Sequence, residues 1–354
     1  MSKRIVIVGA GAVGGYFGAH LALAGEDVTL VDPWPEHVDT IRRQGLSVTG
    51  MTDEETICAK PRVLHLTEVQ GLSKEKPVDI AIIATKSYDT TWATMMIAPY
   101  LASDGYIVSA QNSINEERIA GVVGWGRVLG CMVGNNFAVD LHEAGHIRRT
   151  MPRSRDVYSL QVGEVHGRLT PRLQELARIL AAVDSICVTP NLWGARWSKL
   201  CVNGMRNGVS AATGMGGNAR DAHDQIRKVV IRLAGEAVQV GEALGYELET
   251  ILRLEPKQFV RAMEGDTKTL AEVEASLLAG TKGSARSNLQ RPSMAQDMEK
   301  GRKTEIDEIN GFIAAKGAEV GVKASTHEAL TQIVKDVERG VLPPRPQNLF
   351  SLAS

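Results

Sequence analysis

A glycine-rich turn directly follows a short apolar run near the start of the chain. Residues 4–8 read Arg-Ile-Val-Ile-Val, the β-branched pattern of a buried parallel strand. Gly9, Gly11 and Gly14 follow with the spacing G-x-G-x-x-G, and then come a helical stretch and a second apolar run at 28–31. Strand, turn, helix and strand within about 32 residues make one βαβ unit. We therefore expect the chain to open with a Rossmann domain.

Each glycine of this turn has a physical reason to be there. Gly9 makes the tight strand-to-helix turn, Gly11 lets the backbone approach a pyrophosphate, and Gly14 allows close packing of helix on strand. The pyrophosphate charge would sit at the helix N-terminus. These glycines, with Ala12 and Val13, are the predicted cofactor-binding residues. A plain glycine-rich turn is the alternative interpretation.

An acidic residue ends the second apolar run. Asp32 lies 18 residues after Gly14, where a carboxylate can accept hydrogen bonds from the adenosine ribose and repels a 2′-phosphate. No basic residue immediately follows, and Arg42 and Arg43 lie a helix away. Asp32 therefore favours NAD over NADP as the cofactor. The alternative is that Asp32 only begins a turn before Pro33.

The rest of the chain divides into an alternating half and a helical half. Strands expected at 78–84 and 106–110, with a helix at 90–101 between them, indicate a mostly parallel sheet with right-handed crossovers. Three shorter segments of alternating pattern are expected to extend or edge that sheet: 128–133, 146–150 and 158–162. Amphipathic helical stretches then follow one another: 195–210, 221–244, 256–263, 270–278, 304–319 and 325–336.

The predicted fold is therefore an α/β Rossmann domain followed by an all-α domain. Its expected parts are a dinucleotide-binding domain at 1–189, a helical substrate domain at 190–340 and a loose tail at 341–354. A length of 354 residues is sufficient for two domains that each have a core.

Composition narrows the class of protein further. A formal net charge of −1 gives no reason to expect a nucleic-acid partner. The four cysteines have no paired spacing and are expected to be reduced thiols in a cytoplasmic protein. The uncharged run 5–25 resembles a membrane span, but it contains six glycines and breaks into strand and turn, so no membrane association is expected. The oligomeric state stays open, with a homodimer as one option.

A polar stripe begins just after the predicted domain boundary. Lys199, Asn203 and Asn207 recur at i, i+4 and i+8. On an α-helix these positions drift by about 40° per step, so the three side chains share a face. A solvated polar face is the alternative. The apolar residues around the stripe and its place at the boundary favour a face that lines a substrate cleft.

Several segments resemble the ketopantoate reductase family, in order and over nearly the whole chain. They are 9–18, 83–86, 111–112, 197–207, 293–297 and 303–311. The segment 197–207 resembles the family's catalytic helix. The resemblance implies a Rossmann domain, a helical second domain and NAD(P)-dependent reduction of a 2-keto acid to a 2-hydroxy acid.

The resemblance also implies roles for individual residues. Lys199 would donate the proton to the carbonyl oxygen as hydride arrives, and its charge would stabilise the developing alkoxide. Glu305 would orient Lys199 or hold a substrate hydroxyl. The remaining predicted contacts are Asn203, Asn207 and Ser293 with substrate, Asn112 with substrate and nicotinamide, and Lys86 with the cofactor. Burial lowers the pKa of an ammonium group and a neighbouring carboxylate raises it, which would tune such an acid.

The chain also departs from the family pattern. Family members usually carry an arginine suited to NADPH just after the second strand, where this chain has Val31-Asp32-Pro33-Trp34. Ser113 stands where a glycine is common. The segment 139–166 is longer than usual. An NAD-dependent D-2-hydroxyacid dehydrogenase of the same family, acting on a branched, aromatic or sugar-derived acid, is therefore the alternative. A non-catalytic dinucleotide sensor is the alternative from another class, against which the presence of Lys199, Asn203 and Glu305 argues.

Two further patterns are expected to carry no chemistry. His142-Glu143-Ala-Gly-His146 matches the zinc-protease signature H-E-x-x-H, which requires both histidines on one helix face. The glycine inside it and its surroundings predict strand, turn and strand, and we expect no metal site. The charged stretch 297–308 is interpreted as a solvated helix face from which only Glu305, with Asn310 just beyond it, points inward.

Overall fold

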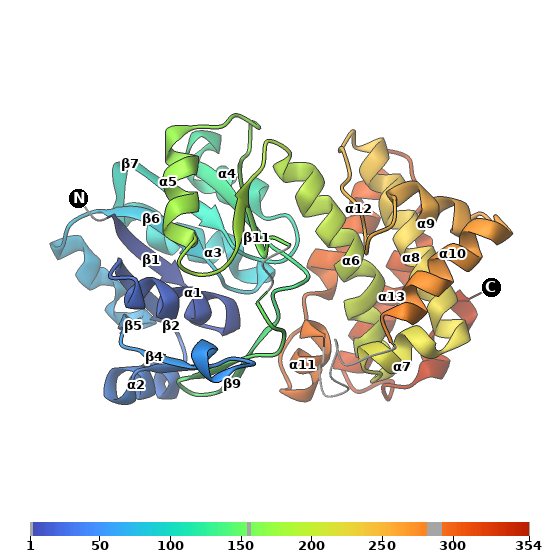
Figure 1. Ribbon diagram of the computed structural model, residues 1–354, viewed down its shortest axis with the longest axis horizontal. Coiled ribbons are helices and arrows are strands. Elements are labelled where there is room, and N and C mark those ends of the chain that lie inside the picture. The colour runs from blue at the N-terminus through green and yellow to red at the C-terminus, as the bar shows by residue number, and fades with distance from the viewer. Residues whose placement is uncertain (1–2, 154–156, 282–291, 354) are drawn as a thin grey trace. The chain divides into compact units, whose positions relative to one another are not determined.

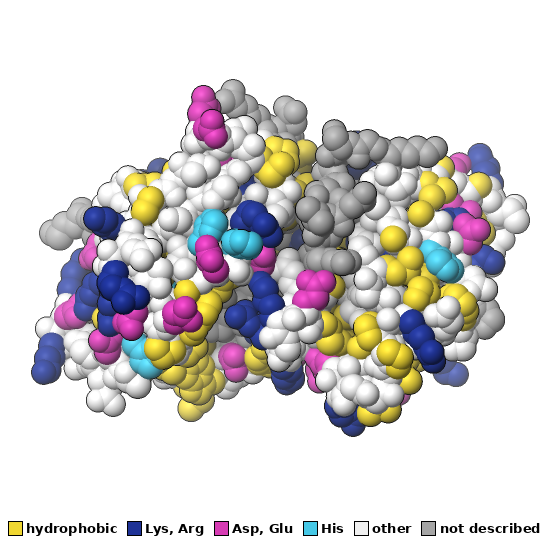
Figure 2. Space-filling view, turned by 90° about the horizontal axis from the view of Figure 1, so that it is seen from below, with side chains coloured by type: hydrophobic (Ala, Val, Ile, Leu, Met, Phe, Trp, Pro, Cys, Tyr) yellow, Lys and Arg dark blue, Asp and Glu magenta, His cyan; other side chains and the backbone are white. Residues whose placement is uncertain are grey.

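The computed structural model describes residues 3–153, 157–281 and 292–353. The chain forms two compact units, Met1–Leu192 and Trp193–Ser354 (Figure 1). Among the described residues, no helix combines the length and the apolar character needed to span a bilayer. Basic and acidic side chains are interspersed over the surface seen in Figure 2, in keeping with the near-neutral composition.

An eight-stranded sheet forms the centre of the N-terminal unit. Its strands are β1 (Arg4–Val8), β2 (Asp27–Asp32), β5 (Arg62–His65), β6 (Val78–Ile83), β7 (Leu101–Ser109), β8 (Val128–Val133), β11 (Leu160–Glu164) and β12 (Ile186–Val188). Their order is β12-β11-β8-β7-β6-β1-β2-β5. The strands from β5 to β8 in that order are parallel, and only the β8–β11 pair is antiparallel. The expected mostly parallel Rossmann sheet is confirmed.

Helices cover both faces of this sheet because its strands are apolar on both faces. Ile5 and Ile7 of β1 join one core cluster, which also contains Phe17 from a helix, whereas Val6 and Val8 join the other. Alternate residues of a strand point to opposite faces, so a continuous apolar run supplies both cores. The helices of the unit are α1 (Ala12–Leu23), α2 (Pro35–Gln44), α3 (Thr90–Ile97), α4 (Glu116–Val123) and α5 (Pro171–Leu180).

A second, four-stranded sheet corrects one expectation from the sequence. It consists of β3 (Leu46–Thr49), β4 (Ile57–Ala59), β9 (Val139–Glu143) and β10 (His146–Arg149), in the order β4-β3-β10-β9. The segment 146–150 was expected to extend the main sheet, but β10 pairs with β3 and β9 instead. Ile147 of β10 is fully buried in the same core cluster as Phe17 of α1. The small sheet therefore closes over α1, which carries the glycine turn.

The C-terminal unit is built from helices, as predicted. They are α6 (Leu192–Thr213), α7 (Gly217–Ala222), α8 (Asp224–Ala243), α9 (Pro256–Met263), α10 (Thr267–Ala279), α11 (Ser293–Glu299), α12 (Phe312–Glu319) and α13 (Ser325–Glu338). The indole of Trp197 donates a hydrogen bond to the Ala237 carbonyl oxygen at 2.8 Å and joins α6 to α8. Glu236 of α8 accepts hydrogen bonds from the backbone N–H groups of Thr326 and His327, so a carboxylate caps the first turn of α13.

The expectation about the end of the chain is wrong. The segment after 341 is not a loose tail: it contains the 3₁₀ turn η7 (Pro346–Leu352), and Leu349 is fully buried. The amide of Asn348 donates to the carbonyl oxygen of Ala212 in the last turn of α6. Because the last carbonyl groups of a helix have no partner within it, this segment satisfies one of them.

The charged stretch 297–308 is also not a solvated face throughout. Asp297 and Glu308 are buried, with 4% and 8% of their surface exposed. Glu305 and Asn310 are buried as expected. Residues Asp307–Gly311 form a π-helical turn, η6, before α12. A π turn changes the register of the side chains along a helix, so a regular 3.6-residue period misassigns which of them face inward.

Candidate functional site

The glycine turn lies between β1 and α1 and has the predicted geometry. Gly9 has φ of +95°, and its N–H donates to the Val31 carbonyl oxygen at 2.8 Å. A Cβ atom on Gly14 would lie 2.0 Å from the Gly9 carbonyl oxygen, so that position requires glycine for packing. A Cβ on Gly11 would meet nothing within 4 Å. Protein packing thus does not require glycine at position 11, and the open space there suits the approach of a phosphate group.

Asp32 supports the glycine turn directly. Its Oδ2 atom accepts a hydrogen bond from the Ala10 N–H at 2.8 Å, and its Oδ1 atom accepts one from the Trp34 N–H at 2.9 Å. The bond to Trp34 is the local turn that the alternative interpretation of Asp32 described. The side chain is 8% exposed, and each carboxylate oxygen has a second lone pair that could receive a ribose hydroxyl.

A buried histidine that the sequence did not reveal completes this support. His37 of α2 accepts a hydrogen bond from the Gly145 N–H at Nδ1, at 2.8 Å. Its Nε2 atom lies 2.9 Å from the Ala10 carbonyl oxygen. Since Nδ1 accepts a backbone N–H, Nε2 must carry the proton and donate it to Ala10. The turn between β9 and β10 is thereby connected to the glycine turn, a link over 108 residues that no local pattern predicts.

Lys86 and Asn112 lie at the same edge of the sheet as the glycine turn. Lys86 follows β6 and Asn112 follows β7, and these strands are neighbours of β1 in the order β7-β6-β1. The carboxyl ends of adjacent parallel strands form the edge where ligands of such sheets bind. The structure therefore brings three of the predicted cofactor segments together within the N-terminal unit.

The loop after β7 is held by buried amides. The Asn115 side chain donates to the Asn112 carbonyl oxygen at 2.7 Å, and the Ser87 hydroxyl donates to the same oxygen at 3.0 Å. The Gln111 side chain donates to the Thr85 carbonyl oxygen at 2.9 Å. Ser113 has φ of 65°, the left-handed conformation that glycine adopts most easily. The loop therefore keeps, with a serine, the backbone shape for which glycine is suited.

The polar stripe of the C-terminal unit lies on α6. Since 192–213 is one helix, Lys199, Asn203 and Asn207 share a face as predicted. Asn203 is buried, whereas Lys199 and Asn207 are partly buried. Burial, and secondly the positive charge of Arg206, lower the pKa of Lys199 to about 7. An ammonium group with this pKa can donate a proton near neutral pH.

Arg206 is a member of the stripe that the sequence interpretation missed. It follows Lys199 by seven residues, two helical turns, and therefore projects from the same face. Its guanidinium lies 3.4 Å from the Asp221 carboxylate, which also binds the buried Arg220 at 2.8 Å. The i, i+7 spacing was the available signal. The positive charge of Arg206 is thus anchored near Lys199 by the Asp221 carboxylate.

The segment that contains Glu305 packs against α6. The Asn310 amide donates to the Gly204 carbonyl oxygen at 2.9 Å. A Cβ on Gly208 would lie 2.9 Å from the Ile306 side chain, so glycine at this position permits close contact. Glu305, 3% exposed, immediately precedes Ile306. Ser293 is the first residue of α11 and is partly buried.

A Rossmann-type unit with an intact glycine turn, followed by a helical unit with a lysine–asparagine stripe, defines a class: dinucleotide-dependent oxidoreductases. Residues 5–160 match the family described as Ketopantoate reductase PanE/ApbA, and residues 191–338 match Ketopantoate reductase PanE/ApbA C terminal. The chain belongs to the ketopantoate reductase family.

Individual relatives match over almost the full length. A 2-dehydropantoate 2-reductase from Archaeoglobus fulgidus is 27% identical over 344 residues, covering 96% of this chain and 99% of the relative. The solved PanE/ApbA family ketopantoate reductase from Ralstonia eutropha JMP134 has a TM-score of 0.74 at 25% identity, covering 96% of this chain and 99% of that one. D-mandelate dehydrogenase, solved with NADH and anilino(oxo)acetate, has a TM-score of 0.77 at 24% identity, with 96% and 99% covered. The last likeness shows a shared fold.

Proposed function

We propose that this protein reduces a 2-keto acid to a 2-hydroxy acid with a nicotinamide cofactor and with Lys199 as the general acid. Ketopantoate is the first candidate substrate, because the curated relatives are 2-dehydropantoate 2-reductases. The observation that carries the proposal is the lowered pKa of Lys199, about 7, on a polar face of α6. Pantothenate biosynthesis in the cytoplasm is the corresponding setting.

In this proposal, residues of the N-terminal unit hold the cofactor and Lys199 of the C-terminal unit supplies the proton. The glycine turn and the carboxyl ends of β6 and β7 would hold the cofactor, with Asn112 in contact with its nicotinamide and Lys86 also near the cofactor. When bound, the reduced nicotinamide supplies the hydride. Lys199 holds the proton that the carbonyl oxygen needs as its charge develops, and its own positive charge stabilises that oxygen beforehand.

Side chains around Lys199 would orient the substrate. Asn203 and Asn207 present amides on the face of Lys199, and such groups can donate hydrogen bonds to carboxylate or hydroxyl oxygens. Ser293 would bind the substrate carboxylate, and Arg206 adds a fixed positive charge that favours an anion. Glu305 would orient Lys199 or accept a hydrogen bond from a substrate hydroxyl.

Asp32 supports NAD as the preferred cofactor. Its carboxylate is largely buried and fixed against the backbone of Ala10 and Trp34, so it cannot swing away from an incoming 2′-phosphate. Electrostatic repulsion would weaken NADP binding, whereas ribose hydroxyls can donate to the remaining lone pairs.

A second candidate follows from the same residue. NAD preference suits a D-2-hydroxyacid dehydrogenase that acts on another branched, aromatic or sugar-derived acid. D-mandelate dehydrogenase, which shares the fold and was solved with NADH, is an example of that activity. A non-catalytic dinucleotide sensor is the remaining alternative, and the presence of Lys199, Asn203 and Glu305 argues against it, because a sensor need not retain a proton donor.

Initial rates of NADH and NADPH oxidation test these alternatives. They would be measured with ketopantoate and with a panel of branched, aromatic and sugar-derived 2-keto acids. Turnover of ketopantoate supports the first candidate, and NADH-linked turnover of another acid alone supports the second. Binding of NADH without turnover of any 2-keto acid would contradict the proposal and favour the sensor.

A further inference from the structure

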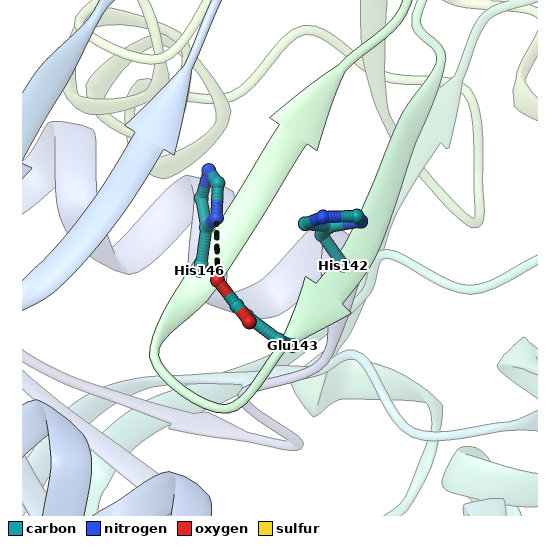
Figure 3. A group of neighbouring side chains, drawn as sticks. All are labelled: His142, Glu143 and His146. Atoms are coloured by element: carbon teal, nitrogen blue, oxygen red, sulfur yellow. Dashed lines mark hydrogen bonds and ion pairs between the residues drawn. The ribbon is translucent and has the colours of Figure 1, made fainter.

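The H-E-x-x-H motif lies on the β9–β10 hairpin of the N-terminal unit. His142 and Glu143 end β9, and His146 begins β10, so the motif has the expected strand–turn–strand form. The protease interpretation fails because the histidines do not lie on a helix. Their ligand atoms nevertheless all lie within 4.8 Å of one another and of a Glu143 oxygen. Figure 3 shows the two imidazole rings and the carboxylate gathered at this hairpin.

A β-bulge accounts for this gathering. Neighbouring residues of a strand normally point to opposite faces. In the β9–β10 pair, His146 lies opposite Glu143 and Ile147 lies opposite Leu141, so His142 is the extra residue. A bulge re-aims side chains, which allows the consecutive residues His142 and Glu143 to reach the same place as His146.

The separations suit a small divalent ion. Nδ1 of His146 lies 3.3 Å from Oε1 of Glu143. Two ligands that bind a tetrahedral zinc ion at about 2.0 Å are about 3.3 Å apart. The rings of His142 and His146 lie 5.4 Å apart at 87°. All three side chains therefore need only small rotations to share one ion.

A neighbouring strand orients one of the ligands. The Thr49 hydroxyl of β3 lies 2.6 Å from Nε2 of His146. Without a metal, Nδ1–H of His146 donates to the Glu143 carboxylate, and Nε2 accepts a hydrogen bond from the Thr49 hydroxyl. A metal bound at Nδ1 would replace that proton, and Nε2–H could then donate to Thr49. Metal-binding histidines usually have such a partner on the other ring nitrogen, whereas a histidine–carboxylate pair on a protein surface does not require one.

An open hollow beside the ligands gives an ion access and leaves room for water. It has a volume of about 490 Å³ and is lined by residues of β3, β4 and the β9–β10 turn, including Glu143 and His146. His142 and Glu143 are exposed. Water molecules could therefore complete the coordination of an ion held by three side chains.

We propose that His142, Glu143 and His146 form a binding site for one divalent transition-metal ion. Two imidazoles and one carboxylate favour zinc, cobalt or nickel over magnesium or calcium, which prefer oxygen ligands alone. The reaction proposed above requires no metal, so this ion would take no part in that chemistry. A metal here would link β9 and β10 beside the turn that joins them, where His146 pairs with Glu143.

The test is direct binding to the full chain, prepared without a polyhistidine tag and stripped with a chelator. Calorimetric titration with Zn²⁺ should show one ion per chain. His142→Ala should abolish that binding because it removes one of the three ligands. Since His142 is exposed, this variant should remain folded. Thr49→Val should keep the stoichiometry and weaken affinity by about 10–100-fold, the usual effect of losing such an orienting partner.

A matched control separates this site from unspecific histidine binding. His166 is exposed on the same unit and lies beside Glu164, so His166→Ala removes a histidine–carboxylate pair elsewhere. That variant should bind Zn²⁺ like the unaltered protein. Absence of stoichiometric binding, or equal binding by His142→Ala, would overturn the proposal. Melting temperatures measured without metal verify that each variant is folded.

Discussion

The glycine turn of the N-terminal unit and the polar stripe of the C-terminal unit are constructed in opposite ways. Backbone groups form most of the first, and side chains such as Asp32 and His37 hold that backbone in place. Side chains form the second, on one face of a single helix, and in the proposed reaction its chemistry depends on the charge of Lys199. The comparison teaches that backbone shape would decide cofactor binding, whereas a protonation state would decide the proposed reaction.

The largest expected effect comes from removing the ammonium group of Lys199, which tests whether the polar stripe acts through its charge. Lys199→Ala should lower kcat by about 10²–10⁴ because the proton donor is lost. Its dissociation constant for NADH should change little, since the glycine turn is intact. Steady-state rates and fluorescence titration with NADH measure the two effects. Lys228→Ala removes an exposed lysine of α8 and serves as the control, and an unchanged rate for Lys199→Ala would exclude it as the acid.

Breaking the support of the glycine turn should affect stability and cofactor binding together. Asp32→Ala leaves the N–H groups of Ala10 and Trp34 without this acceptor, which should cost about 1.5–3 kcal/mol of unfolding free energy. The KM for NADH should also rise. Urea denaturation and steady-state kinetics measure both, with the exposed Asp39→Ala as the control. If Asp32 only contacts the ribose, the KM will rise without a loss of stability.

The pH dependence of kcat/KM tests how the charge of Arg206 affects the pKa of Lys199. If the protonated form of Lys199 is the acid, as proposed, kcat/KM for reduction should fall as pH rises above about 7, by about tenfold per unit. Arg206→Gln removes a charge that lowers the pKa of Lys199 and should shift this fall to higher pH, whereas Arg206→Lys should shift it less. A profile that does not move with Arg206→Gln would contradict the coupling.

The smallest expected effect comes from the Asn348–Ala212 hydrogen bond, which should contribute to the stability of the C-terminal unit and not to the reaction. Asn348→Ala removes the hydrogen bond to the Ala212 carbonyl oxygen and should lower the free energy of unfolding by about 0.5–1.5 kcal/mol. The catalytic rate should stay unchanged because the contact lies at the far end of α6 from Lys199. Urea denaturation and steady-state rates provide the measurements, and a lower rate with unchanged stability would show that the closing segment affects the site.

The sequence predicted what is encoded locally. The glycine turn, the strand before it and the shared face of Lys199 and Asn203 each depend on residues within a few turns of one another. The pairing of β10 with β3 was missed because a strand of four residues does not indicate its partner. His37 and the burial of Asp297 depend on contacts between distant segments, and local periodicity contains no information about those.

Asp32 also limits how this protein could be redesigned. The side chain proposed to select the cofactor also accepts hydrogen bonds from the backbone N–H groups of Ala10 and Trp34. Exchanging it for a basic residue to admit a phosphorylated cofactor would remove both bonds at once. An engineer who wishes to change cofactor preference would do better to keep the aspartate and vary the exposed positions around it. In evolution, the same dependence would make a switch at this position require compensating changes elsewhere.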